Sequence, residues 1–213
     1  MIGIVAHTAR ADAAHQLMES VGAAYMSVDD GTLGCDNNHR KAWQWMANNN
    51  PGEWSTIVED DAKPIPNFRH HLHHALAAAG TDIVSLYRGH RVNNPPGEQH
   101  GLNATERADD ANACWIHSHL LLHAVAVAIK TPLIDDMLKH IRTVALPIDE
   151  AITHWMRKTK PARTVAYTHP SLVDHADTDP VILRRRDKMP RPKGRTAYKT
   201  GVPTEWTDKA VTL

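Results

Sequence analysis

Three consecutive carboxylates follow a short β-branched segment of the chain. Residues 56–58 read Thr-Ile-Val, Glu59, Asp60 and Asp61 come directly after them, and two prolines follow soon afterwards. Three adjacent negative charges repel one another, and a divalent cation or a metal–phosphate complex would neutralise them. Because ligands of open α/β sheets bind at the carboxyl ends of strands, the segment predicts a metal site. A solvated loop with a helix N-cap is the alternative interpretation.

The spacing of these acids indicates which of them could share one ion. Alternate residues of an extended chain face the same side, so Glu59 and Asp61 could bind one cation or one metal-bound diphosphate. Mg²⁺ or Mn²⁺ is expected because hard oxygen ligands prefer hard cations. Phosphatases and nucleases also use such carboxylates, so the motif alone leaves the reaction open.

A second polar segment, Gly-Cys-Asp-Asn-Asn-His, runs from Gly34 to His39 between a predicted strand and a predicted helix. Backbone amides at a helix N-terminus can receive an anion, which would suit a phosphate. An N-cap formed by Asp36 or Asn37 explains the same residues equally well.

Two later segments carry further candidates. Pro147 sets Asp149 and Glu150 at the start of a predicted helix, where Asp149 taken by itself would be an N-cap. His175 follows the last predicted strand, and with sixteen histidines in the chain a single one is usually incidental. The run His70-His71-Leu-His73-His74 could bind zinc, but a solvated helix face explains it better.

Hydrophobic periodicity predicts alternating strands and helices. Strands are expected over 2–6, 24–28, 54–58, 82–87, 113–117, 124–129 and 163–168, and helices over 10–21, 35–49, 67–79, 131–141 and 148–158. This alternation predicts an α/β protein, with a single Rossmann-like domain over residues 1–183 and a mostly parallel central sheet flanked by helices. Residues 88–110, rich in Gly, Asn, Pro and charge, predict a long loop.

The C-terminal residues 184–213 differ from the rest in charge. They hold nine Lys or Arg against three acids, although the formal net charge of the whole chain is zero. The composition predicts an extended or partly disordered tail that could contact nucleic acid, fold back over a bound diphosphate or serve solubility.

Cysteine use and hydropathy bear on the compartment. Cys35 and Cys114 lie far apart and form no Cys-x-x-Cys pair, which favours a reducing environment over a disulfide scaffold. The longest apolar stretch falls well short of the ~20 residues of a membrane helix, and no signal peptide is evident. A cytoplasmic location, in a bacterium or in the host cell of a virus, is expected.

Four segments, taken in this order, resemble the motifs of glycosyltransferase family 25, the lipopolysaccharide and procollagen galactosyltransferase type. They are Gly-Thr-Leu-Gly-Cys-Asp-Asn-Asn-His at 31–39 with Ala42-Trp43, Val-Glu-Asp-Asp-Ala at 58–62, Pro-Ile-Asp at 147–149, and Pro-Ser-Leu-Val-Asp-His at 170–175. The resemblance spans residues 1 to 178. Asn38 stands where the family has a serine.

The resemblance implies a fold of the GT-A type and transfer of a sugar, with inversion, from a nucleotide-sugar donor to a hydroxyl acceptor. A UDP-sugar is the expected donor, a glycan or a protein is the expected acceptor, and Mn²⁺ or Mg²⁺ would hold the donor diphosphate. The implied metal ligands are Asp61, Glu59 and His175, with Asp149 as the general base and Glu150 as its rival. The implied contacts to the nucleotide donor are His7, Arg10, Gly34, Asn38, His39, Glu59 and Asp60.

Two other functions remain open from the residues themselves. The carboxylates with some of the histidines would also suit a metal-dependent phosphoesterase or nuclease. The basic residues 184–213 would suit a nucleic-acid-binding accessory protein.

Overall fold

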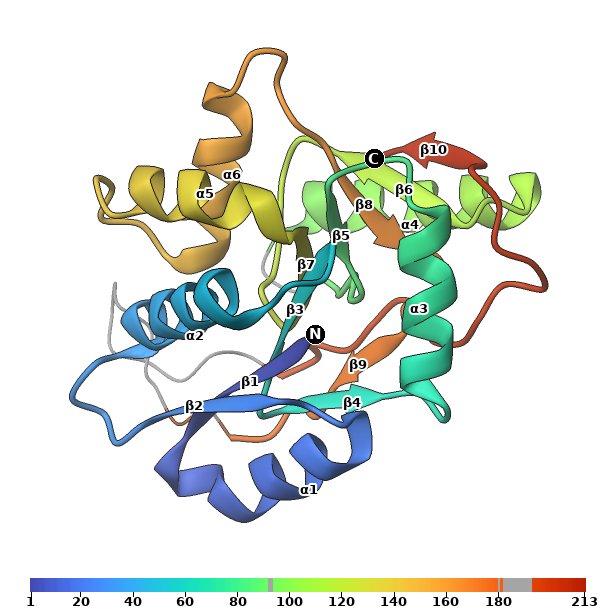
Figure 1. Cartoon of the computed structure of the whole chain (residues 1–213). Coiled ribbons are helices and arrows are strands. Elements are labelled where there is room, and N and C mark those ends of the chain that lie inside the picture. The colour runs from blue at the N-terminus through green and yellow to red at the C-terminus, as the bar shows by residue number, and fades with distance from the viewer. Residues whose placement is uncertain (92–93, 180, 182–192) are drawn as a thin grey trace.

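The computed structural model describes residues 1–91, 94–179, 181 and 193–213. Within these residues, eight strands form one sheet in the order β10-β6-β8-β5-β7-β3-β1-β2 (Figure 1). The strands are β1 (Ile2–His7), β2 (Tyr25–Asp29), β3 (Trp54–Glu59), β5 (Ile83–Ser85), β6 (Trp115–Ser118), β7 (Ala126–Lys130), β8 (Val165–Thr168) and β10 (Ala210–Thr212).

Parallel pairing predominates in this sheet. Four neighbouring pairs are parallel, namely β1 with β2, β1 with β3, β5 with β8 and β6 with β10. The other three pairs are antiparallel, and two of them involve β7. The predicted mixed α/β domain with a mostly parallel central sheet is therefore confirmed.

Helices cover both faces of the sheet (Figure 1). The helical segments are η1 (Thr8–Arg10), α1 (Ala11–Val21), α2 (Cys35–Asn49), α3 (Phe68–Ala78), α4 (Pro95–Ala111), η2 (Thr131–Leu133), α5 (Ile134–Ile141) and α6 (Ile148–Lys158). Apolar residues of α2, α4, α5 and α6 share one core with the sheet, and those of α1 and α3 share the other. Two short strands, β4 (Ala62–Pro64) and β9 (Val173–His175), form a separate antiparallel pair.

Strand β1 shows why both faces are covered. Ile2, Ile4 and Ala6 belong to the core beneath α1 and α3, whereas Val5 belongs to the core beneath α2. A strand with apolar residues on both faces leaves apolar surface exposed to water unless helices cover each face of the sheet. Gly3 allows α2 to approach, because a Cβ there would lie 2.5 Å from Met46 Cε.

A loop was predicted over residues 88–110. This prediction is wrong from Pro95 onward, where helix α4 begins. Asn94 caps the helix by accepting a hydrogen bond from the Gly97 N–H, and Pro95 occupies its first turn. Low helix propensity misled the prediction, since burial of Ala104 and Ala108 in the core stabilises α4 through tertiary packing. The Asn-Pro pair was the available signal of a helix start.

The described part of the C-terminal segment is not an extended tail. Residues 210–212 form the edge strand β10, and the Trp206 ring lies 5.2 Å from the Trp115 ring. The Trp115 indole N–H also donates to the Thr207 carbonyl at 2.7 Å. Residues 193–213 thus complete the sheet, whereas the basic positions 184–186, 188 and 191 lie outside the described residues.

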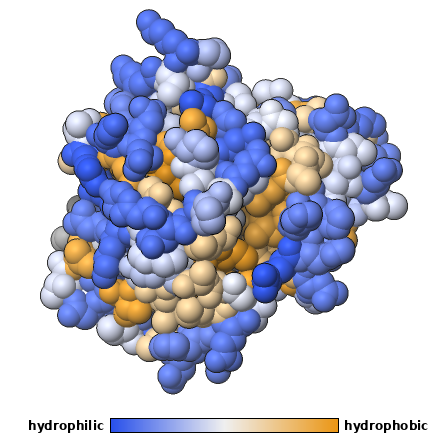
Figure 2. Space-filling view, in the orientation of Figure 1, coloured by the Kyte–Doolittle hydropathy of each residue, from blue (hydrophilic) through white to orange (hydrophobic). Residues whose placement is uncertain are grey.

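One face of the molecule is largely polar. Figure 2 shows hydrophilic residues over most of one face, with a band of hydrophobic residues across its middle. His70, His73 and His74 are exposed on α3, as a solvated helix face predicts. None of the helices in the described ranges has both the length and the apolar character that crossing a membrane requires.

Candidate active site

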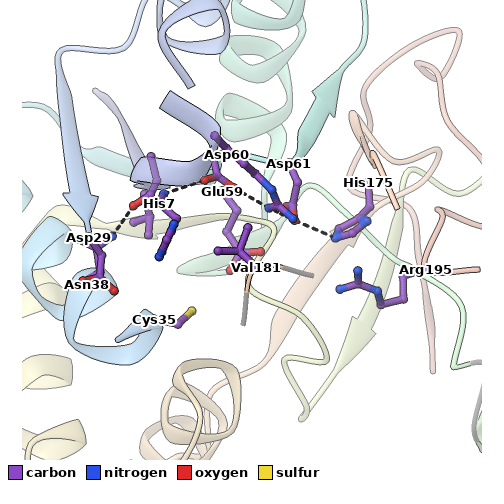
Figure 3. A pocket seen from close by; sticks show the side chains of 13 residues that line it. His7, Asp29, Cys35, Asn38, Glu59, Asp60, Asp61, His175, Val181 and Arg195 are labelled. Atoms are coloured by element: carbon purple, nitrogen blue, oxygen red, sulfur yellow. Dashed lines mark hydrogen bonds and ion pairs between the residues drawn. The ribbon is translucent and has the colours of Figure 1, made fainter. Parts of the chain in front are cut away.

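Three neighbouring parallel strands deliver the predicted site residues to one edge of the sheet. Strand β1 ends at His7, β2 at Asp29 and β3 at Glu59, and their carboxyl ends point the same way. A cavity of about 130 Å³ lies at this edge (Figure 3). Its lining consists of Val5, Ala6, His7, Arg10, Asp29, Cys35, Asn38, Glu59, Asp60, Asp61, His175, Val181 and Arg195.

Asp60 is held at both carboxylate oxygens. The His7 backbone N–H donates to Oδ2 at 2.8 Å, and Arg10 Nη1 donates to Oδ1 at 2.9 Å. Burial raises the pKa of Asp60, and these two donors oppose the rise. Asp60 therefore anchors Arg10 and the end of β1, and its oxygens are already in use.

Asp61 differs from Asp60 because one of its carboxylate oxygens has no hydrogen-bond partner among the described residues. Oδ2 accepts a hydrogen bond from Arg10 at 2.7 Å and lies 3.4 Å from His175 Nε2. Oδ1 is buried and has no hydrogen-bond partner among the residues that the structure describes. Burial alone would raise the pKa of Asp61, but His175 and Arg10 outweigh it and lower the pKa to about 2. The side chain is therefore an anion at neutral pH, with an oxygen free to bind a cation.

His175 reaches the site through the small β4–β9 sheet, where it pairs with Ala62. The Asp177 backbone N–H donates to His175 Nδ1 at 2.8 Å, so the proton of a neutral ring lies on Nε2. Nε2 faces Asp61, and 3.4 Å separates it from Asp61 Oδ2. In this arrangement His175 positions Asp61, and its expected role as a metal ligand stays a prediction.

The loop between β2 and α2 is built on Asp29. Its carboxylate accepts hydrogen bonds from the backbone N–H groups of Gly31, Leu33 and Gly34, at 2.9 to 3.0 Å. Gly34 has φ +77°, which favours glycine, and it ends the loop where α2 begins. The predicted anion contact at Gly34 is thus a helix start whose amide already serves Asp29.

Asn38 is a structural brace. Its Oδ1 accepts from the Ser27 hydroxyl at 2.6 Å, and its Nδ2 donates to the carbonyls of Ala6 and Ser27. These bonds tie α2 to β1 and β2 and use both N–H groups of the amide, so a contact of Asn38 with a donor nucleotide could be made only through Oδ1.

The His39 side chain is 1% exposed. It contacts Glu59 and does not line the cavity. Its Nε2 lies 2.9 Å from Glu59 Oε1. Burial lowers the pKa of His39, but hydrogen bonds with Cys35 and Glu59 outweigh it and raise the pKa to about 10. Cys35 lines the cavity, and the sequence interpretation gave it no role. Its place one turn before His39 on a helix was the available signal.

Asp149 lies in the first turn of α6 and is not among the residues that line the cavity. The Ile148 N–H donates to Asp36 Oδ1 at 3.0 Å, which fastens α6 to the start of α2. Burial, followed by the charges of Glu59 and Glu150, raises the pKa of Asp149 to about 6, although the Glu150 N–H opposes the rise. Glu150 itself is exposed. Of the two predicted bases, Asp149 is the one in electrostatic contact with the site acids.

Arg195 brings a cation from the C-terminal segment into the cavity lining. Its Nε lies 3.6 Å from Asp177 Oδ1, and Tyr87 donates to its carbonyl at 2.5 Å. Nε is buried and makes no hydrogen bond within the described part of the chain. One residue of the basic C-terminal segment thus lies at the cavity, and folding of that segment over a bound diphosphate stays a prediction.

Comparison with known proteins leaves the family open. No family model matches the chain, and no curated protein matches it. A crystal structure of A197 from STIV aligns with 82% of this chain and 84% of its own, at 10% sequence identity and a TM-score of 0.47. A similarity at that level bears neither on family nor on activity.

Proposed function

We propose that the protein is a metal-dependent glycosyltransferase that moves a sugar from a nucleotide donor to a hydroxyl acceptor. The observation that carries this proposal is Asp61 Oδ1, a buried anionic oxygen without a hydrogen bond in the described residues, on a side chain that lines the cavity. Such an oxygen is costly unless a cation or a donor group meets it. A hard divalent ion fits it, and Mg²⁺ or Mn²⁺ is the proposed cofactor.

One carboxylate is enough if the substrate supplies further ligands. Mg²⁺ is usually held by one or two carboxylates together with phosphate oxygens and water. The ion would stabilise the charge that develops on the departing diphosphate. Asp61 is held ready for this by Arg10 and His175, so its orientation does not have to be fixed when the donor binds.

The Arg195 guanidinium suits the same leaving group. Arg195 lines the cavity with an unbonded Nε, and His7 ends β1 at the same edge. A diphosphate that enters would meet the Arg195 guanidinium as well as the ion on Asp61. Positive groups on two sides of the departing oxygen favour cleavage of its bond to the sugar.

Asp149 is the proposed general base. The acceptor oxygen attacks the anomeric carbon, the bond to the diphosphate oxygen breaks with its electron pair, and the acceptor proton passes to the Asp149 carboxylate. With a pKa of about 6 Asp149 is ionised at neutral pH and is a stronger base than an ordinary carboxylate. Inversion, the UDP-sugar donor and the glycan or protein acceptor are proposed from the family resemblance.

The direct test is nucleotide release. The protein is incubated with a panel of nucleotide sugars and Mn²⁺, and free nucleoside diphosphate is measured with and without a chelator. We expect chelation to stop the release and Asp61→Ala to reduce it at least about 100-fold, since the metal stabilises the transition-state charge. Asp12→Ala, on the exposed side of α1, is the control that should keep wild-type activity.

A phosphoesterase is the second candidate, because Asp61 and Arg195 could equally hold and neutralise a phosphodiester. Release of product from phosphodiesters but not from nucleotide sugars would favour it and exclude sugar transfer. The nucleic-acid-binding alternative depends on positions 184–186. Since residues 193–213 are part of the fold, the triple variant Arg184→Gln, Arg185→Gln, Arg186→Gln tests it better than a deletion.

A further inference from the structure

Three donor atoms of different chemistry converge where helix α2 meets strand β3. The Cys35 sulfur, a His39 ring nitrogen and a Glu59 carboxylate oxygen all lie within 4.8 Å of one another. Cys35 and His39 are one turn apart on α2, and Glu59 is the last residue of β3. Among the described residues, neither Asp61 nor His175 belongs to a group of three or more such donors that meets this distance.

The separation of the His39 nitrogen and the Glu59 oxygen is close to the one that a tetrahedral ion imposes. Bonds from zinc to nitrogen and to carboxylate oxygen are about 2.0 to 2.2 Å, so two such ligands at a tetrahedral angle lie about 3.3 Å apart. His39 Nε2 and Glu59 Oε1 are now 2.9 Å apart and share a proton instead. A small rotation of the Glu59 side chain would make room for an ion in place of that proton.

The donor set selects the ion. A thiolate is a soft ligand that Mg²⁺ and Mn²⁺ bind poorly, whereas Zn²⁺, Co²⁺ and similar ions accept sulfur, imidazole and carboxylate together. One thiolate and one carboxylate also balance the charge of a divalent ion. We infer that Cys35, His39 and Glu59 form a binding site for Zn²⁺ or a chemically similar ion, separate from the Asp61 oxygen that the proposed function uses.

The site is open on one side. Cys35 and Glu59 both line the cavity, and Figure 3 shows their side chains directed into it from α2 and β3. His39 closes the opposite side from within the core. Three protein ligands with a fourth position open to a cavity is the arrangement of zinc sites that bind water or a substrate group.

Rigid elements hold the three ligands. The Glu59 backbone N–H donates to the Val125 carbonyl at 2.8 Å, and Asn38 fastens α2 to the sheet. His70 and His74 on α3, in contrast, are exposed and belong to no group of three such donors among the described residues. A site on rigid elements loses less conformational entropy when the ion binds.

The test uses Co²⁺ as a spectroscopic substitute for Zn²⁺. The metal-free full-length chain is titrated with Co²⁺ without oxygen, and the near-ultraviolet and visible spectra are recorded. We expect one equivalent to produce a thiolate-to-cobalt charge-transfer band with intense tetrahedral bands, which one equivalent of Zn²⁺ abolishes and excess Mg²⁺ does not. A spectrum without the charge-transfer band would contradict the inference.

Variants assign the ligands. Cys35→Ser should remove the charge-transfer band and weaken Zn²⁺ binding by more than about tenfold, since even outer-shell changes cost about that much. Cys35→Ala is a second variant, and circular dichroism verifies that both are folded. Glu59→Gln should weaken Zn²⁺ binding but keep the band. The inference is overturned if the band survives in both Cys35 variants or if they bind Zn²⁺ as tightly as the wild type.

Three controls separate this site from other ligands. Cys114→Ser tests the other cysteine, which is buried and bonded to the C-terminal segment, and His74→Gln tests the surface histidines. Asp61→Asn tests the oxygen of the proposed transferase. All three should keep the cobalt spectrum, and its loss in any of them would contradict the assignment. Failure of the transferase assay leaves this result unaffected, because the readout is metal binding alone.

Discussion

At the scale of single residues, the site is a set of acids whose environments differ. Asp60 is bonded at both oxygens, Asp61 at one, and Asp149 stands apart beside the charge of Glu59. These environments drive the pKa values of Asp61 and Asp149 in opposite directions, to about 2 and about 6. Two carboxyl groups whose pKa values differ in this way are suited to different tasks, one as a permanent anion and the other as a base.

The raised pKa of Asp149 predicts the pH dependence of the proposed sugar transfer. A base acts only when it is deprotonated, so activity should rise as the pH passes about 6 and level off above it. Glu150→Gln removes a nearby negative charge and should move this midpoint to lower pH, while Asp149→Asn should abolish activity. The rate is measured across pH 4.5 to 8, roughly the range that brackets this titration. A midpoint that does not move in Glu150→Gln would contradict the assignment.

Replacement of Arg10 is expected to lower both the stability and the proposed activity of the protein. It bridges Asp60 and Asp61 with distances of 2.9 and 2.7 Å and is only 17% exposed. Removing one partner of a poorly exposed ion pair leaves the other charges uncompensated, so Arg10→Ala should lower the free energy of unfolding by about 2 kcal/mol. Urea denaturation at pH 7 measures this. Arg157→Ala, on the exposed end of α6, should change it by less than about 0.5 kcal/mol.

The pH dependence of stability should follow Asp61 in acid. Because its folded pKa of about 2 lies below the ordinary value of 3.8, its contribution is present above pH 3.8 and is lost as the pH falls toward 2. The raised pKa of Asp149 acts in the other direction, since a more basic carboxyl in the folded state costs stability as the pH rises from about 4 through 6.

At the scale of elements, the start of helix α2 determines the geometry of the site. Asp29 holds three backbone amides of the preceding loop, and Gly34 turns the chain with φ +77°. The helix then carries Cys35 to the cavity and His39 into the core. At the same helix start, Asp36 accepts a hydrogen bond from the Ile148 N–H, and this bond positions α6.

Gly34 gives a test of this element. A Cβ at Gly34 meets no atom within 4 Å, so the cost of Gly34→Ala comes from the backbone alone, about 1 to 2 kcal/mol. Gly80→Ala is a matched control, because that Cβ is equally free and its φ is not in the left-handed region. Thermal unfolding should show a lower Tm for Gly34→Ala only. Equal effects in both variants would show that Gly34 has no special role.

At the scale of the whole molecule, the C-terminal segment closes the sheet and contributes to the site. Strand β10 pairs with β6 at one edge, and upstream of it Arg195 lines the cavity at the ends of the central strands. One segment therefore completes the sheet and also contributes Arg195 to the cavity lining, although its composition predicted an extended or partly disordered tail.

Trp206 tests the attachment of this segment. Its ring packs on Trp115, which is 1% exposed, so Trp206→Ala should lower the free energy of unfolding by about 2 kcal/mol through lost apolar contact. Val202→Ala, at a residue 40% exposed, is the control with a change below about 0.5 kcal/mol. Chemical denaturation measures both. If the Trp206→Ala protein is as stable as the wild type, the C-terminal segment is a separable tail.

The fold class and the place of the acids could be predicted because they depend on local pattern. Apolar runs such as residues 2–6 and 54–58 alternate with amphipathic helices, and burial of those faces requires a layered α/β sheet. Acids at the end of a strand must lie at an edge of the sheet wherever that strand is placed. Helix α4 escaped prediction because its stability comes from packing of Ala104 and Ala108, which no local pattern displays.

Only the tertiary structure decided what each acid does. Asp60 and Asp61 are neighbours of the same residue type, and nothing in their sequence separates them. Their difference comes from Arg10, from the His7 amide and from His175, which the β4–β9 pairing brings from far along the chain. Hydrogen bonds and burial act over a few ångströms in space, so the sequence determined which chemical groups are available and the fold determined which of them remain free to react.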